Sequence, residues 1–213
     1  MKRILLLLTL SLFISCKKKT EEVKPDVKEN PEFSALHDGD IIFQTSLSSQ
    51  SQAIQMATKS VYSHCGVIYK EADKYYVFEA IQPVTKTPLE KWIARGKDAH
   101  YVVKRLKAAK DGLKDWQIRE MKEAGKEMAG KDYDLYFGWG DDKIYCSELV
   151  WKLYHKAGAE LCPTQQLKDF DLTNNAVKQK LHERYRNNIP MEEKVVSPAA
   201  LFNSNLLYTV TSK

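Results

Sequence analysis

The chain has 213 residues, of which 43% are hydrophobic and 29% are charged. These proportions are those of an ordinary soluble domain, and they exclude both a bundle of membrane helices and a wholly disordered chain. The small numbers of glycines (9) and prolines (7) exclude collagen-like and low-complexity architectures. A net charge of +5, part of it at the extreme N-terminus, is too small and too local to indicate a nucleic-acid partner.

The N-terminus has the layout of a secretory leader. Lys2 and Arg3 precede an apolar run over residues 4–15, and Cys16 follows directly. The run is shorter than the roughly 20 residues that a membrane-spanning helix needs. Because the leader ends in a cysteine and resembles a bacterial lipoprotein signal, we predict a signal peptide over residues 1–15, lipidation of Cys16, and an exported chain anchored to a membrane of the cell envelope. The alternative is a plain signal peptide followed by an incidental cysteine.

The next segment is predicted to be a tether. Residues 17–31 are almost all charged or proline, so they cannot bury enough apolar surface to offset the entropy lost on ordering. We therefore assign residues 16–32 to a lipidated cysteine and a solvated spacer. The folded domain is predicted to span residues 33–213.

The first half of this domain is rich in strand signals. The apolar run Ile41 to Phe43 follows a turn at residues 38–40 and predicts a buried strand. Two β-rich runs separated by a polar stretch predict a hairpin. The hairpin runs are residues 64–69 and 75–80, a further strand is predicted at 101–106, and a short helix at 51–59.

The second half is mainly helical. The predicted elements are helices at residues 115–129, 144–157 and 173–186, a loop rich in glycine and aromatic residues at 130–140, and a last strand at 206–210. The helix at 144–157 has one apolar stripe at helical spacing and ends before Gly158, a residue suited to stop a helix. Strands followed by helices indicate the α+β class, with an antiparallel sheet packed against helices.

Cys146 is the first candidate for chemistry. It lies at the start of a predicted helix, after Asp141 and Asp142, either of which is suited to cap that helix. Unpaired N–H groups at a helix N-terminus stabilise a thiolate, and the thiolate is the nucleophilic form of cysteine. The alternative is a small core residue on the apolar stripe, because free cysteine is among the most buried residue types. Position alone leaves both interpretations open.

His64 and Glu79 form the second candidate pair. His64 opens one strand of the predicted hairpin, and Glu79 is a charged residue within the other, otherwise apolar strand. Adjacent strands lie about 5 Å apart, so the two side chains are able to meet. A catalytic histidine needs such a partner to hold one tautomer and to stabilise the imidazolium. The alternatives are a core histidine and a solvent-facing glutamate.

The cysteines do not indicate a metal or a cofactor. The chain has four cysteines and no Cys-x-x-Cys spacing, and Cys16 belongs to the leader. An oxidising compartment permits a disulfide among the other three, Cys65, Cys146 and Cys162, but three cysteines cannot all pair. An odd thiol in an exported protein is either reactive or well buried.

Several short motifs occur in a specific order. They are Gly39-Asp40-Ile41-Ile42-Phe43, Ser63-His64-Cys65-Gly66-Val67-Ile68, Phe78-Glu79-Ala80, Gly130-x-x-Tyr133-Asp134 and Tyr145-Cys146-Ser147-Glu148-Leu149-Val150. In this respect the chain resembles the YiiX/YaeF branch of the NlpC-type papain-like cysteine hydrolases, over about residues 36–162. The fold of that branch is circularly permuted, so that the histidine strand precedes the cysteine helix.

The resemblance implies a cysteine amidase or peptidase. It places the nucleophile on Cys146, the general base on His64 and the residue that orients the base on Glu79, with a thioester intermediate. It implies a peptide or acyl amide or ester as substrate, and leaves cell-wall peptides and acylated molecules both open. Tyr62 and Tyr145 flank the histidine and the cysteine, and we name them as candidates to line the cleft, with aromatic packing as the alternative.

Two other functions stay open. A non-catalytic binding lipoprotein on the same fold is expected to have lost a member of the triad, and none is lost here. A purely structural lipoprotein predicts a neutral, unreactive Cys146. Cys65, the neighbour of the proposed base, is predicted to face the core, since adjacent residues of a strand point to opposite faces.

Overall fold

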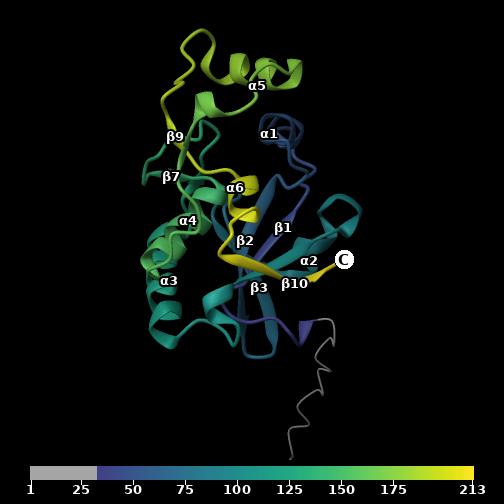
Figure 1. Ribbon diagram of the computed structural model, residues 1–213, viewed down its shortest axis with the longest axis vertical. Helices are drawn as coiled ribbons and strands as arrows, with labels where there is room; N and C mark the ends of the chain where they lie inside the picture. Colours follow the sequence, from purple (N-terminus) through teal and green to yellow (C-terminus); the bar gives the residue numbers. More distant parts are fainter. Residues whose placement is uncertain (1–32) are drawn as a thin grey trace, which may run out of the picture.

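A computed structural model describes residues 33–213 of the chain. The predicted signal peptide (residues 1–15) and tether (residues 16–32) lie outside the described residues. The described residues are built around a six-stranded sheet with strand order β10-β5-β1-β2-β3-β4 (Figure 1). Every neighbouring pair in it is antiparallel. Its strands are β1 (Ile41–Gln44), β2 (His64–Glu71), β3 (Lys74–Glu79), β4 (Thr85–Pro88), β5 (Val102–Leu106) and β10 (Leu207–Ser212).

Both faces of this sheet are covered. The face that carries Phe43, Cys65 and Val67 packs against two helices, α3 (Asp115–Met128) and α4 (Cys146–Lys156). Figure 1 shows these helices together along one side of the sheet. The alternate residues of the central strands, among them Ile42, Ile68 and Val77, pack on the other face against Trp92 of the short helix α2 (Leu89–Ala94).

This double covering explains the sequence pattern of the central strand. All four residues of β1 are buried, because it lies between β5 and β2 with apolar layers on both sides. A strand buried on both faces carries a continuous apolar run rather than an alternating one. The predicted strand at Ile41 to Phe43 is therefore confirmed, as is the α+β class.

The remaining elements lie outside the main sheet. They are the helices α1 (Ser51–Thr58), α5 (Asn175–Tyr185) and α6 (Pro198–Phe202), and the 3-10 turns η2 (Lys97–Ala99), η3 (Lys107–Ala109) and η4 (Leu167–Asp169). Two small ladders complete the fold: β6 (Asp132–Tyr133) pairs in parallel with β7 (Lys143–Ile144), and β8 (Gln165–Gln166) pairs with β9 (Lys194–Val195). α1 and α5 contact each other at the top of Figure 1. Within residues 33–213, no helix has both the length and the apolar character needed to cross a membrane.

The start of α4 differs from the prediction. The helix begins at Cys146 rather than at residue 144, and its N-cap is Tyr145. Neither Asp141 nor Asp142 caps it: Asp141 instead pairs with Lys152 at 2.9 Å, and the Tyr145 N–H donates to Glu148 at 3.4 Å. This start favours Cys146 as a nucleophile, because the first residue of a helix has a backbone N–H without an intrahelical acceptor.

Candidate active site

His64 and Glu79 meet inside the β2–β3 hairpin. His64 is the first residue of β2 and Glu79 the last residue of β3, and the His64 Nε2 and the Glu79 Oε2 atoms are 2.6 Å apart. Both side chains are buried. Gly66 allows the close approach of the strands, since a Cβ atom there would lie 2.4 Å from Val77 and 2.8 Å from the carbonyl oxygen of Phe78. The hairpin predicted from sequence therefore produces the predicted contact.

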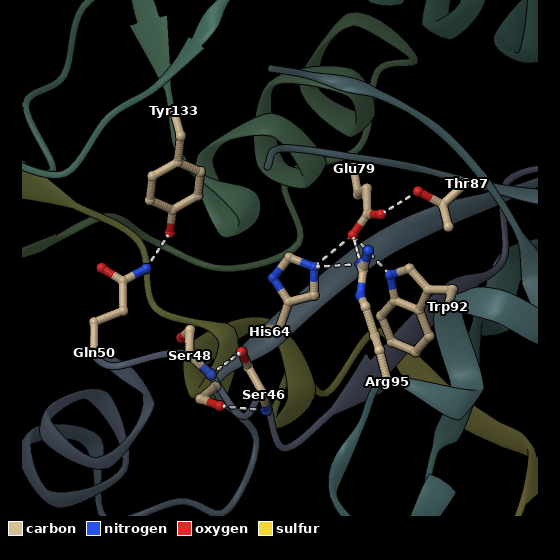
Figure 2. Close-up of polar contacts among 10 residues, drawn as sticks. Ser46, Ser48, Gln50, His64, Glu79, Thr87, Trp92, Arg95 and Tyr133 are labelled. Atoms are coloured by element: carbon tan, nitrogen blue, oxygen red, sulfur yellow. Dashed lines mark hydrogen bonds and ion pairs between the residues drawn. The ribbon is translucent and has the colours of Figure 1, made fainter. Parts of the chain in front are cut away.

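The Glu79 carboxylate is held from three further directions (Figure 2). Thr87 Oγ1 donates to Oε1 at 2.6 Å, Trp92 Nε1 donates to Oε2 at 2.8 Å, and Arg95 forms an ion pair with Oε2. Burial alone would raise the pKa of Glu79, but His64, Arg95 and Thr87 together hold it below its ordinary value. A fully buried carboxylate thus remains charged behind the imidazole.

Cys146 reaches the same histidine from the opposite layer of the fold. By strand alternation His64 and Glu79 belong to the face that packs on Trp92, whereas Cys146 lies in the core between the sheet and α3–α4. The encounter takes place because His64 is the terminal residue of β2, at the point where the sheet ends. Since Nε2 is engaged with Glu79, the other ring nitrogen, which points away from Glu79 in Figure 2, is left for the sulfur.

The electrostatics of the pair favour charge separation. Burial alone would lower the pKa of His64, but the hydrogen bonds and charges of Cys146 and Glu79 raise it to about 9. The pKa of Cys146 is held well below its ordinary value, first by a hydrogen bond from the Cys65 side chain and then by His64, against the effect of burial. The arrangement therefore supports a thiolate and an imidazolium side by side at neutral pH.

Cys65 has a contact that the sequence did not predict. It is fully buried on the α4 side of β2, as expected for the neighbour of His64 in a strand. In that position the Cys65 thiol donates a hydrogen bond to the Cys146 sulfur. Burial and the negative charge of Cys146 raise the pKa of the Cys65 thiol well above its ordinary value. Cys65 is therefore a neutral donor to the sulfur of Cys146. All three cysteines in the described residues, Cys65, Cys146 and Cys162, are free.

Tyr133 is the functional candidate that the sequence analysis missed. Its hydroxyl accepts a hydrogen bond from Gln50 Nε2 at 2.9 Å, which leaves the O–H free to donate, and it interacts with the Cys146 sulfur. Burial raises the pKa of Tyr133 well above its ordinary value, so the group is a neutral donor. Tyr133 belongs to the Gly-x-x-Tyr-Asp motif quoted above, and that motif was the available signal; Gln50, which precedes α1, has no such signal.

The two predicted cleft tyrosines lie in different environments. Tyr145 lines an apolar cleft next to Cys146, and its hydroxyl accepts from the Val196 N–H at 3.1 Å. Tyr62 stacks on Phe202, with ring centroids 4.0 Å apart, and lines neither of the two clefts described here. The geometry favours the packing interpretation for Tyr62 and a place at the cleft for Tyr145.

Two clefts flank the Cys146–His64 pair. The first has a volume of about 90 Å³, lies between α1 and α5, and contains Cys146. The second, of about 380 Å³, is lined by His64, Arg95 and three serines, Ser46, Ser48 and Ser63. Among residues 33–213 there is no group of three or more His, Cys, Asp or Glu side chains that is able to hold a metal ion.

Comparison with known proteins identifies the class. A sequence profile of the permuted papain-like amidase enzymes of the YaeF/YiiX type, the C92 peptidase family, matches residues 35–211. The chain therefore belongs to this family, whose members are papain-like amidases, and the protein is a hydrolase of that kind. The circularly permuted papain-like fold implied by the motifs is confirmed.

Two relatives support the assignment. The Escherichia coli K12 protein YiiX is 49% identical over 176 residues, which cover 82% of this chain and 86% of YiiX. The crystal structure of yiiX from Escherichia coli O157:H7, described as a metalloprotein, matches with a TM-score of 0.80 and 49% identity. That match covers 84% of this chain and 98% of the other.

Proposed function

We propose that the protein cleaves an amide or ester bond through a Cys146–His64–Glu79 triad and a thioester intermediate. The observation that supports this most directly is the continuous buried chain from the Glu79 carboxylate through the His64 ring to the Cys146 sulfur. A structural cysteine requires neither an imidazole partner nor a carboxylate behind it. The family supplies the general chemistry, amide hydrolysis, and the described residues supply the groups that perform it.

The first half of the reaction forms the acyl-enzyme. The Cys146 thiolate attacks the carbonyl carbon, and the electron pair of the carbonyl moves onto its oxygen. Two donors are available for this oxyanion: the backbone N–H of Cys146 at the first residue of α4, and the Tyr133 hydroxyl. When the bond to the leaving group breaks, the protonated His64 gives its proton to the departing nitrogen or oxygen.

The second half releases the acid. His64, now neutral, takes a proton from water, and the resulting hydroxide attacks the thioester carbon. The carbon–sulfur bond breaks, the acid leaves, and the thiolate–imidazolium pair is restored. Glu79 stabilises the imidazolium and keeps Nε2 occupied, so that the other nitrogen faces the sulfur and the substrate in both halves.

The test is thiol reactivity as a function of pH. Iodoacetamide should label Cys146 rapidly below pH about 8.5, the pKa of a free thiol, and the His64→Ala variant should label slowly. Cys162, whose pKa is raised by burial to about 11, is an internal control that should label slowly in both proteins. Slow labelling of Cys146 in the unmodified protein would contradict the ion pair, and would favour the purely structural lipoprotein.

The export of the chain and its lipid anchor form a separate part of this proposal. It rests on the leader alone: two basic residues, the apolar run over residues 4–15 and Cys16. Expression in a bacterium followed by mass spectrometry of the mature N-terminus should find a diacylated cysteine at position 16. In Cys16→Ser the lipid should be absent and the protein should no longer sediment with membranes. Retention of residues 1–15 in the purified protein would contradict the proposal.

A further inference from the structure

Two hydrogen bonds in series link α5 to the Tyr133 hydroxyl. Arg184 Nη2 donates to Gln50 Oε1 at 2.5 Å, and Gln50 Nε2 donates to the Tyr133 hydroxyl at 2.9 Å. Figure 2 shows the second of these bonds, with the amide oxygen of Gln50 on the side away from Tyr133. The three residues come from α5, from the position before α1 and from β6. The two bonds therefore connect α5 to the hydroxyl group beside the Cys146 sulfur.

The orientation of the Gln50 amide decides where the Tyr133 proton points. A glutamine amide bonds to a hydroxyl in either of two ways, because its nitrogen donates and its oxygen accepts. If the oxygen faced Tyr133, the tyrosine O–H would donate to Gln50 and would be lost to an oxyanion. With the nitrogen facing Tyr133, as here, the hydroxyl oxygen accepts from Gln50 and its own proton is left for the side of the sulfur.

Arg184 fixes this orientation. A guanidinium group has donors and no acceptor, so only the oxygen of the Gln50 amide is able to face it. The nitrogen must then lie on the Tyr133 side. The amide orientation thus follows from the chemistry of the three groups.

The surroundings of Arg184 hold the guanidinium at the amide. Arg184 is half-buried, its Cζ atom lies 4.7 Å from the centroid of the Phe137 ring, and burial lowers its pKa. Within residues 33–213 it pairs with no carboxylate, and the adjacent acid on α5, Glu183, is engaged by Lys180. Partial burial of a cation is unfavourable unless its donors are used, and here the bond goes to Gln50.

We infer that Arg184 is a positioning residue, which acts through the Gln50 amide to fix the direction in which the Tyr133 hydroxyl donates. The inference rests on the proposed function, in which that hydroxyl stabilises the oxyanion. It gives α5 a role in catalysis, although α5 contributes no member of the proposed triad.

Two reactions of the Cys146 sulfur test the inference, because only one of them passes through an oxyanion. With p-nitrophenyl acetate the thiolate attacks the carbonyl carbon, an oxyanion forms, and the carbon–oxygen bond to p-nitrophenolate then breaks. With iodoacetamide the thiolate displaces iodide from a saturated carbon, so no oxyanion forms. The ratio of the acylation rate to the alkylation rate, measured on the purified full chain, therefore reports the oxyanion donors and does not depend on the amount of folded protein.

Arg184→Met keeps much of the length and apolar bulk of the side chain but removes its donors. The acylation-to-alkylation ratio should fall at least about threefold, because the Gln50 amide is free to turn its oxygen toward Tyr133. Arg184→Lys keeps a cation with donors only and should preserve the ratio. Lys178→Met removes a cation from an exposed position of the same helix that does not line the α1–α5 cleft, and should leave both rates unchanged.

A pair of variants at Gln50 tests the direction of the bond. Gln50→Glu presents an acceptor oxygen to Tyr133 while Arg184 still holds the other oxygen, so the ratio should fall at least about tenfold. Gln50→Leu removes the bond without offering an acceptor and should lower the ratio less. In a Tyr133→Phe background neither Gln50→Glu nor Arg184→Met should lower the ratio further, because both act through the missing hydroxyl. Additive losses in that background would overturn the inference.

The same measurements separate this inference from the proposed function. If p-nitrophenyl acetate does not acylate Cys146 in the unmodified protein, the proposed function fails and the role of Arg184 fails with it. If acylation takes place and Arg184→Met leaves the ratio unchanged, Arg184 is not a positioning residue and the hydrolase proposal stands. An equal loss in acylation and alkylation would mean that Arg184 acts on the thiolate through its charge, which also overturns the inference.

Discussion

Two buried acids are paired with arginine, Asp40 directly before β1 and Glu79 at the end of β3, and the two pairs have different consequences. Asp40 accepts from Arg105 Nε at 2.7 Å and Nη2 at 2.8 Å, and the remaining guanidinium donors reach the carbonyl oxygens of Lys110 and Ala35. Glu79 accepts from Arg95, Trp92, Thr87 and the His64 ring. Both carboxylates are almost completely buried, so burial of an ion pair does not by itself distinguish a catalytic group from a structural one.

The partners of the two acids make the difference. In the Asp40–Arg105 cluster, the other hydrogen bonds of Arg105 go to backbone carbonyl oxygens. The cluster links the start of β1 to β5 and lines neither cleft. The Glu79 cluster includes an imidazole whose second nitrogen faces a thiol at a helix N-terminus. We therefore expect changes at Asp40 to affect stability, and changes along the Glu79–His64–Cys146 chain to affect turnover.

The largest effect is expected at the sulfur end of this chain. Cys146→Ala should lower kcat/KM for amide hydrolysis by at least about 10³-fold, because the neighbouring thiol of Cys65 is fully buried and neutral and cannot replace the lost nucleophile. The unfolding midpoint should change little, since one sulfur atom is removed from a position where Ala also fits a helix start. Cys162→Ala is the matched control and should retain full activity. Turnover by Cys146→Ala would mean that the triad is not the catalytic machinery.

The second prediction concerns the supporting cluster. Asp40→Asn should lower the free energy of unfolding by about 3 kcal/mol, because removing one partner of a buried pair leaves the other charge uncompensated. Urea unfolding measures this, and activity per folded molecule should stay close to that of the unmodified protein. Glu123→Gln, which breaks the exposed pair with Lys126, is the control and should have little effect. A loss of activity in Asp40→Asn without a loss of stability would erase the contrast between the clusters.

The sequence predicted the elements that carry strong periodic patterns. The β2–β3 hairpin, the buried strand β1 and the apolar stripe of α4 were all predicted with boundaries displaced by only a few residues. β4, with the sequence Thr-Lys-Thr-Pro, was missed because it is a polar edge strand, and the small ladders β6–β7 and β8–β9 have only two residues per strand. Such short elements form because tertiary contacts stabilise them, and the local sequence does not encode those contacts.

The site was predicted in part for the same physical reason. His64 and Glu79 were found because the hairpin brings them together locally. Cys146 required the family motif, since its encounter with His64 joins residues 82 positions apart, the difference between 146 and 64. The hydroxyl of Tyr133, oriented by Gln50, depends on a contact between a loop and the start of α1 that no periodicity encodes.

The third prediction tests that hydroxyl. Tyr133→Phe should lower kcat by about 10²-fold with a smaller change in KM, because the lost donor acts on the oxyanion that exists only in the transition state. Tyr136→Phe is the matched control, because Tyr136 lies three positions further along the chain, is exposed and lines neither cleft. A rise in KM with kcat unchanged would instead indicate that Tyr133 binds the ground state and the transition state equally.

The smallest expected effect separates the charge of Glu79 from its shape. The His64 pKa, raised to about 9, keeps the imidazolium protonated as the pH rises, so kcat/KM should decline only near pH 9. Glu79→Gln keeps the size of the side chain but removes the carboxylate, and Arg95 then faces His64 without its partner. Both changes disfavour the imidazolium, so the alkaline decline should move to lower pH by at least about one unit.

The direction of this shift decides between two roles for Glu79. A residue that only packs the ring in place would lower kcat/KM equally at every pH and leave the decline near pH 9. A residue that holds the imidazolium moves the decline, and the deficit of Glu79→Gln should then be smallest at neutral pH, where the ring is still protonated, and should grow as the pH rises. Rates measured from pH about 6 to about 10 in one buffer series, with Thr87→Val as a control that keeps the carboxylate, distinguish the two roles, because only loss of the charge acts on the protonation of His64.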